Sequence, residues 1–228
     1  MKTHYLLPLL LFGLLISSCK SSNSDETTSD AVTVMPTGTP KGIPYTIDAP
    51  RSELKWTGFK PTSSHFGTVP IGEGTIYIDG ELITGGTIEV KMTELTVDDL
   101  EGQKKIDLEN HLKGTEAGEE DHFFNVQKFP TATFVVLNSV KLTDDPLGTH
   151  QINGNLTIKG ITNPVSFKAV VDMSSGVAMK AVAEPFMIDR SKWDVRYKSK
   201  SFYDDLSDKF IKDEIRFELT IGAVKTQG

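Results

Sequence analysis

Hydrophobic and polar residues alternate with a period of two through most of the chain after residue 42. Residues 87–92 (Thr-Ile-Glu-Val-Lys-Met) and 215–221 (Ile-Arg-Phe-Glu-Leu-Thr-Ile) place their apolar side chains on one face. Such alternation is typical of a half-buried β-strand. The same pattern, with turn sequences such as Asp-Gly and Asn-Gly between the runs, predicts further strands at 74–78, 152–158 and 165–173.

Helical patterns are confined to two short stretches, residues 108–113 and residues 202–210. Many antiparallel strands with little helix fit a β-barrel or a β-sandwich. Glycines inside strands let a sheet bend sharply, and this favours a barrel. The glycines that support this choice are Gly72, Gly74, Gly85, Gly86 and Gly154. The sequence therefore predicts an all-β protein, an antiparallel barrel with one or two short helices.

The first 18 residues have the pattern of a secretory signal. A cationic start at Lys2 precedes an apolar run, residues 6–16, that is too short to span a bilayer. Ile16-Ser17-Ser18-Cys19 resembles the bacterial lipobox, in which the cysteine is acylated and becomes the mature N-terminus. We therefore expect Cys19 to be the lipid anchor; the alternative is a plain signal peptide followed by a chance cysteine.

Residues 19–42 have the composition of a tether. They are rich in Ser and Thr and contain few large apolar residues, so they cannot bury enough surface to offset the entropy of ordering. We expect the acylated cysteine and a flexible linker here, followed by one barrel domain over residues 43–226. Lys20, and no aspartate, follows the cysteine, and by resemblance to the usual sorting rule this indicates the outer membrane.

The net charge and the cysteine count exclude several functions. A formal net charge of −7 argues against nucleic-acid binding, which needs a basic face. Since the chain has one cysteine, disulfides within it, Cys-x-x-Cys redox chemistry and iron–sulfur ligation are also excluded. We find no Gly-x-Ser-x-Gly elbow, no phosphate-binding loop and no dinucleotide fingerprint, and we expect no enzyme and no cofactor.

Two blocks in the middle of the domain resemble motifs of one family. His111-Leu112-Lys113, followed by residues 121–134 (Asp-His-Phe-Phe-Asn-Val-Gln-Lys-Phe-Pro-Thr-Ala-Thr-Phe), resembles a motif of the YceI-like family. Residues 152–167 resemble that family's Gly-x-Leu-Thr-x-x-Gly-x-Thr-x-Pro-Val hairpin. The resemblance covers residues 45–224. It implies a lipocalin-like antiparallel barrel that binds a long polyisoprenoid lipid.

The chain departs from the family pattern in three loops. An acidic insert, residues 114–120, separates the two parts of the first motif, and the stretches 61–65 and 174–176 are short. These loops are expected to rim the barrel. They bear on the length and the entry route of the ligand, and they leave the fold prediction unchanged.

Inward-facing side chains of the predicted strands form the expected cavity wall. An eight-stranded barrel is just wide enough to hold one slender ligand. The alternative for each residue is an ordinary place in a packed core. The predicted wall consists of Trp56, Ile76, Ile78, Ile88, Val90, Phe134, Val136, Leu156, Ile158, Phe167, Val171, Phe186, Phe217 and Leu219.

Residues 188–198 interleave cations with aromatic residues. Arg190, Lys192 and Arg196 are the predicted contacts for a phosphate or quinone head group at the barrel mouth. Guanidinium geometry suits a phosphate, and Arg190 is the best single candidate. The alternative is a solvated strand face near acidic residues.

Histidines on either side of the acidic insert raise the question of a metal ion. His111 and His122 flank several acidic residues, but they lack the i, i+4 spacing of a helical zinc site, and no cysteine assists them. We therefore expect no metal, and we expect His111 to cap or pack the short helix.

Together these observations predict a lipid-anchored protein of the bacterial envelope that faces the periplasm or the cell surface. Its expected partners are a long isoprenoid lipid of the quinone or prenyl phosphate type, held for carriage or sequestration, and the membrane through its acyl chains. A homodimer remains open. The alternatives are an interaction module whose barrel is filled by its own side chains, and an enzyme acting on lipid or carbohydrate.

Overall fold

The computed structural model describes Met1 and residues 40–227, which include the whole predicted barrel. Cys19 and the tether up to residue 39 lie outside the described residues. The elements are β1 (Ile43–Ile47), η1 (Ala49–Arg51), β2 (Glu53–Phe59), β3 (Ser64–Val69), β4 (Ile71–Asp79), β5 (Leu82–Lys91), η2 (Met92–Glu94), α1 (Gly102–Lys113), β6 (Thr131–Lys141), β7 (His150–Ile158), β8 (Ile161–Asp172), β9 (Ala178–Ala183), β10 (Phe186–Asp189), η3 (Arg190–Trp193) and β11 (Glu214–Lys225).

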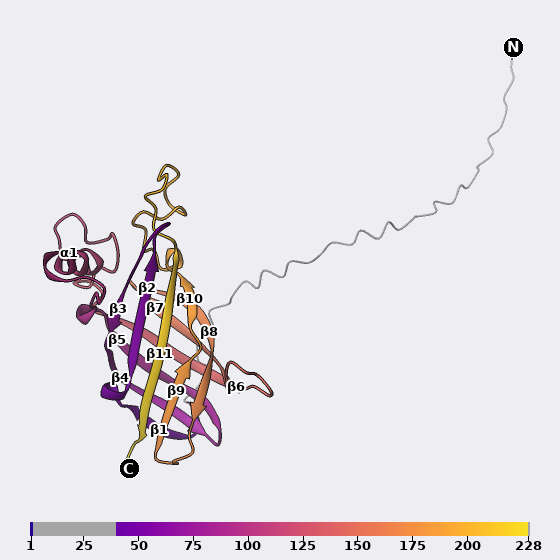
Figure 1. The fold of residues 1–228 in the computed structure, drawn as a ribbon. Coiled ribbons are helices and arrows are strands. Elements are labelled where there is room, and N and C mark those ends of the chain that lie inside the picture. The colour runs from indigo at the N-terminus through magenta and orange to yellow at the C-terminus, as the bar shows by residue number, and fades with distance from the viewer. Residues whose placement is uncertain (2–39, 228) are drawn as a thin grey trace. The chain divides into compact units, whose positions relative to one another are not determined.

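The strands close into an antiparallel barrel. Eight of them form a ring in the order β1-β4-β5-β6-β7-β8-β9-β11, which β11 closes by pairing with β1. Strand β11 serves two sets of neighbours, with β9 and β1 along residues 220–225 and β10 and β2 along residues 214–220. The predicted all-β barrel is confirmed. Figure 1 shows the tilted strands and α1 lying outside the wall.

The period-two pattern becomes the two faces of the barrel wall. In β6, Ala132, Phe134 and Val136 are buried, whereas the residues between them are half-buried. The register continues this layer across the wall, since Phe134 is paired with Ile88 of β5 and with Leu156 of β7. The core therefore sits inside the barrel, as the alternation predicts.

The helix predictions need two corrections. Helix α1 begins at Gly102, six residues before the predicted start, because polar pairs stabilise its first turns: Gln103 donates to Asp107 over 2.8 Å, and Lys105 lies 3.7 Å from Glu109. The predicted helix at 202–210 is wrong. That segment forms turns, and Ser207 has a φ of 47°, which a right-handed helix does not allow.

Among the described residues, none of the helices combines the length and the hydrophobicity that a membrane-spanning helix needs.

Candidate functional site

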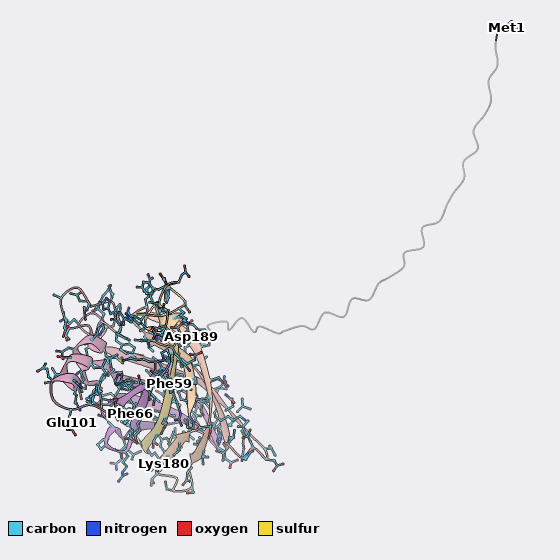
Figure 2. The ribbon with its side chains drawn as sticks, turned by 45° about the horizontal axis from the view of Figure 1, so that its top comes forward. Met1, Phe59, Phe66, Glu101, Lys180 and Asp189 are labelled. Atoms are coloured by element: carbon cyan, nitrogen blue, oxygen red, sulfur yellow. The ribbon has the colours of Figure 1, made fainter. Side chains whose placement is uncertain are left out.

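The barrel encloses an apolar cavity of about 130 Å³ at the end covered by α1 and the segments around it. Strands contribute Trp56, Val90, Leu156 and other wall residues. Segments outside the ring complete the lining, which consists of Leu54, Trp56, Gly58, Phe59, Lys60, His65, Val69, Val90, Met92, Leu95, Leu108, Leu112, Phe123, Phe124, Ala132, Leu156, Ile158, Arg190, Ile211, Lys212, Ile215 and Phe217. Lys180 and Asp189 mark opposite ends of the barrel in Figure 2, which also labels Phe59 of the lining.

A second, smaller cavity of about 30 Å³ lies deeper in the barrel. It is lined by apolar side chains alone, among them Ile76, Ile88 and Leu219. The interior is thus divided into two apolar spaces of unequal size.

Four phenylalanine rings run along the boundary between the two cavities. Their centroids are separated by 5.8 Å (Phe134–Phe167), 4.5 Å (Phe167–Phe186, nearly parallel) and 5.8 Å (Phe186–Phe217). Phe134 and Phe167 line the smaller cavity and Phe217 lines the larger one. We call these four residues the phenylalanine row. A β-carbon at Gly154 would lie 2.4 Å from the Phe134 ring, so this glycine provides the space into which the ring packs.

Ten of the predicted wall residues belong to the buried core, and four are partly buried and pack against it: Leu156, Phe186, Phe217 and Leu219. Eleven of the fourteen line one of the two cavities. Ile78, Val171 and Phe186 line neither of these cavities. Those lining the larger cavity are Trp56, Val90, Leu156, Ile158 and Phe217; those lining the smaller one are Ile76, Ile88, Phe134, Val136, Phe167 and Leu219.

Arg190 lies in the wall of the larger cavity and is 2% exposed. Its guanidinium donates to the backbone carbonyls of Val195 (2.8 Å), Tyr197 (2.9 Å), Ile211 (3.1 Å) and Lys212 (3.1 Å). It also pairs with Asp213 at 3.3 Å. The geometry therefore shows Arg190 tying η3 to the loop before β11.

The other two predicted head-group residues lie on the surface. Residues 190–193 form η3 and the chain then turns, so this segment is not a strand and gives Lys192 and Arg196 no common strand face. Lys192 is exposed. Arg196 is also exposed, pairs with Asp194 and lies over the Phe202 ring. Neither Lys192 nor Arg196 lines the larger cavity.

Cations that the sequence reasoning missed line the larger cavity instead. Lys60 and Lys212 are both exposed residues of the lining. They lie at the same edge, because the Lys212 amide donates to the Phe59 carbonyl over 2.9 Å. The pairing of β2 with β11 brings the two lysines together, although they are 152 residues apart in the chain. No local sequence pattern could have shown this.

His65 connects Lys60 to Asp99 at this edge. Lys60 Nζ lies 3.2 Å from His65 Nε2, and His65 Nδ1 lies 2.8 Å from Asp99 Oδ2. Asp99 also accepts from the Phe66 amide over 3.1 Å. Partial burial raises the pKa of the Asp99 carboxyl, but the hydrogen bonds from Phe66 and His65 together outweigh burial and hold the pKa below its usual value.

The acidic insert brings two histidines and a glutamate together beside the larger cavity. His111 Nε2 lies 2.9 Å from His122 Nδ1 and 3.5 Å from Glu119 Oε2. One ligand atom from each of the three residues lies within 4.8 Å of the others. Burial lowers the pKa of His111, against the charge of Glu119, which raises it. We call these residues the His–Glu–His cluster; among the described residues it is a group that could hold a metal ion.

Comparisons with known proteins identify the family. A family model described as the YceI-like domain matches residues 45–223. Protein YceI of Salmonella arizonae is 34% identical over 104 residues, which are 46% of this chain and 47% of that protein. The chain thus matches about half the length of such curated relatives.

Two solved structures share the fold. BcnA of Burkholderia cenocepacia is 16% identical, with a TM-score of 0.59 over 78% of this chain and 99% of that chain. A polyisoprenoid binding domain from Saccharophagus degradans is 13% identical, with a TM-score of 0.55 over 81% of this chain and 99% of that chain. The family model covers most of the chain, and the barrel agrees with it: the protein belongs to the YceI-like family.

Proposed function

We propose that this protein is a lipid-anchored envelope protein that binds an isoprenoid lipid inside its barrel, for carriage or sequestration and without chemical turnover. The observation that carries the proposal is the apolar cavity of about 130 Å³, whose lining is hydrophobic except at one edge. A ligand with an apolar chain and a polar head fits such a lining. The polyisoprenoid binding domain of Saccharophagus degradans, which shares the fold, supports the same ligand class.

Shape must supply the selectivity for such a ligand. Burying a hydrocarbon chain gains about 0.8 kcal/mol per CH₂ relative to water. The ligand comes from a membrane, however, where its chain is already in an apolar environment, so this gain largely cancels. Affinity then depends on how well the cavity fits the branched chain and on contacts with the head group.

The cavity volume limits how much of a chain the barrel takes in its present form. An engineered protein cavity of about 150 Å³ binds benzene, which has six carbons. The larger cavity, at about 130 Å³, therefore accommodates roughly one five-carbon isoprene unit. A longer chain requires rearrangement of the side chains between the two cavities, and these are the phenylalanine row. We infer that this row moves when a long ligand enters.

The polar edge of the cavity is the proposed site for the head group. Arg190 has its donors engaged by backbone carbonyls and Asp213. Lys60 and Lys212 are exposed, line the cavity and lie at one edge. We therefore assign a phosphate or a quinone oxygen to the two lysines. Replacing both by methionine should weaken binding of a prenyl phosphate more than binding of the matching prenyl alcohol, measured by competition for the full-length protein.

The lipid anchor is tested separately from the cavity. Cys19 follows an apolar segment in the lipobox pattern, and this supports acylation and attachment to the outer membrane. Cells that express the wild-type chain and are fed labelled palmitate should yield a labelled protein in the outer-membrane fraction. Cys19→Ser should abolish both the label and the membrane attachment. A labelled Cys19→Ser protein would contradict the assignment.

Ligand binding is tested by the lipids that co-purify with the protein. The full-length chain is purified from native membranes, and native mass spectrometry should find one prenyl lipid per chain. Ala132→Leu adds three carbons to a residue that lines the cavity and should reduce the bound fraction; Thr131→Leu adds bulk at the exposed neighbouring position and should not. Absence of prenyl lipid from the wild-type protein, or equal occupancy in Ala132→Leu, would refute the proposal.

A second candidate is an interaction module with a filled barrel. The phenylalanine row and the smaller cavity of about 30 Å³ favour it, because side chains already occupy much of the interior. In this case the cap, formed by α1 and residues 114–124 at the mouth of the barrel, and the other loops would bind a protein, and the barrel would stay closed. The co-purification experiment separates the two functions: a module carries no prenyl lipid, and Ala132→Leu leaves its partner binding unchanged.

A further inference from the structure

The His–Glu–His cluster belongs to a part of the molecule that the lipid proposal does not use. His111 stands in the last turn of α1, and Glu119 and His122 stand in and directly after the acidic insert. The hydrogen-bonding atoms of the three side chains converge within 4.8 Å. Eleven residues separate the two histidines, so the fold, and not a local repeat, brings them together.

Surrounding contacts hold the cluster in position. The Tyr197 ring lies 4.5 Å from the His111 ring and 4.6 Å from the His122 ring, measured between centroids. The Tyr197 amide donates to the His122 carbonyl over 3.2 Å, and the His122 amide donates to the Glu119 carbonyl over 3.0 Å. Phe123 contacts His111 edge-on at 5.2 Å. The side chains are thus positioned before any ligand arrives, which lowers the entropic cost of binding.

Two of the three distances between ligand atoms lie close to those of a small tetrahedral ion, and the third is below 4.8 Å. Zinc bonds to nitrogen and oxygen are about 2.0–2.2 Å long, so two ligand atoms of a tetrahedral site lie about 3.3–3.5 Å apart. His111 Nε2 and Glu119 Oε2 lie 3.5 Å apart. His111 Nε2 and His122 Nδ1 lie 2.9 Å apart and need to separate by only about 0.4 Å, within the range of small side-chain rotations.

The chemistry of the donors favours a borderline metal. Imidazole nitrogen suits zinc and other late first-row ions, whereas calcium and magnesium prefer oxygen ligands alone. Two further charges lie near His111: Glu116 raises the pKa of His111, and Lys198 lowers it. Glu116, Glu119 and Lys198 together carry a formal charge of −1, and this negative charge favours binding of a divalent cation. Two histidines and a glutamate leave a fourth position for water.

We propose that His111, Glu119 and His122 form a zinc site that ties the end of α1 to the acidic insert. The neighbours of the two histidines, Leu112 and Phe123, line the larger cavity. Zinc would therefore stabilise the cap over the barrel mouth.

Zinc titration of the full-length, tag-free protein tests the site. The protein is treated with a chelator, exchanged into metal-free detergent buffer and titrated with zinc chloride. We expect one zinc per chain and a rise in the thermal unfolding temperature on addition. Cobalt, used as a spectroscopic substitute, should give the intense visible absorption of a tetrahedral site.

Variants separate the site from adventitious surface binding. Glu119→Gln and His122→Asn should weaken zinc binding at least about tenfold, since each removes a ligand. Glu120→Gln changes the exposed neighbouring carboxylate and should leave binding within about twofold of wild type. Circular dichroism checks that each variant is folded, and Glu119→Gln keeps the shape of the side chain. Failure of the wild type to bind one zinc, or wild-type zinc affinity in Glu119→Gln and His122→Asn, would overturn the proposal.

Discussion

Arg190 joins three parts of the chain through one buried guanidinium. Its donors reach four backbone carbonyls and the carboxylate of Asp213. Arg190→Ala leaves these acceptors unpaired and should lower the free energy of unfolding by about 3–5 kcal/mol, measured by urea denaturation. Arg196→Ala removes an exposed cation nearby and should change stability by less than about 1 kcal/mol. Similar, small losses for both would show that Arg190 is free for a ligand.

Asp99 should make part of the stability depend on pH. Its carboxylate accepts from the Phe66 amide and from His65, and its pKa is lowered in the folded state. A carboxyl with a lowered folded pKa contributes stability above its unfolded pKa and loses it as pH falls through the folded value. Asp99→Asn should therefore lower the free energy of unfolding by about 1 kcal/mol at pH 7 and by less at pH 3.

Urea denaturation at the two pH values measures this difference for Asp99→Asn. Asp205→Asn, at an exposed position in the loop before β11, serves as the control and should give curves close to wild type at both. A cost for Asp99→Asn that is as large at pH 3 as at pH 7 would contradict the assignment.

At the scale of elements, the segment after η2 crosses β3 at close range. The Thr96 amide donates to the Thr68 carbonyl, and the Trp56 indole donates to the Thr96 carbonyl. A β-carbon on Gly67 would lie 1.9 Å from the Thr96 carbonyl oxygen, so the crossing requires glycine there.

Gly67→Ala should destabilise the protein by about 2–3 kcal/mol or more, because backbone and not a flexible side chain must yield. Gly58→Ala, on the paired strand, meets no atom closer than 3.9 Å and should be nearly neutral. Thermal and urea unfolding of the two variants test the difference. Equal stabilities would mean that the 95–98 segment can move away from β3 at little cost.

The two helix predictions show where local patterns succeed and fail. The apolar pair Leu108 and Leu112 marks the C-terminal half of α1, and both residues line the larger cavity. The first turns of α1 bury no apolar face, so periodicity could not locate them. The stretch 202–210 carries a helical pattern, but the Ile211 amide donates to the Lys198 carbonyl and closes the segment into a loop. Its tertiary connection overrides its local preference.

At the scale of the whole molecule, the phenylalanine row lies between the two cavities and would limit how deep the proposed ligand can go. Phe186→Ala removes one of the two central rings, which stacks on Phe167 at 4.5 Å, and should join the two cavities. Loss of a fully buried phenylalanine lowers the free energy of unfolding by about 3–5 kcal/mol. Phe186 is only partly buried, so we expect a loss at or below the lower end of this range. If the barrel binds prenyl lipids, the variant should retain longer chains than wild type, measured by mass spectrometry after incubation with a mixture of chain lengths.

Phe66→Ala is the matched control for Phe186→Ala. Phe66 lies on β3 and is labelled in Figure 2. Because its side chain is 49% exposed, its loss should alter neither the stability nor the chain-length profile appreciably. An unchanged chain-length profile for Phe186→Ala would show that the row does not limit the ligand.

The sequence alone determined the class of fold, the family and the inward-facing residues. Side-chain direction along a strand has a period of two whatever the neighbouring strands are, so the alternation in residues 165–173 already separates the inward from the outward residues of β8. The two family motifs lie within continuous stretches of chain and could be read in the same way.

Only the tertiary structure decided how these residues divide the interior and which polar groups reach it. Phe134 and Phe217 have the same apolar character and stand on different strands, yet they line different cavities because the barrel register sets their depth. Arg190 and Lys212 are both cations, but Arg190 is buried and donates to backbone carbonyls, whereas Lys212 is exposed. Depth, burial and convergence depend on contacts between distant segments, and one-dimensional spacing does not contain them.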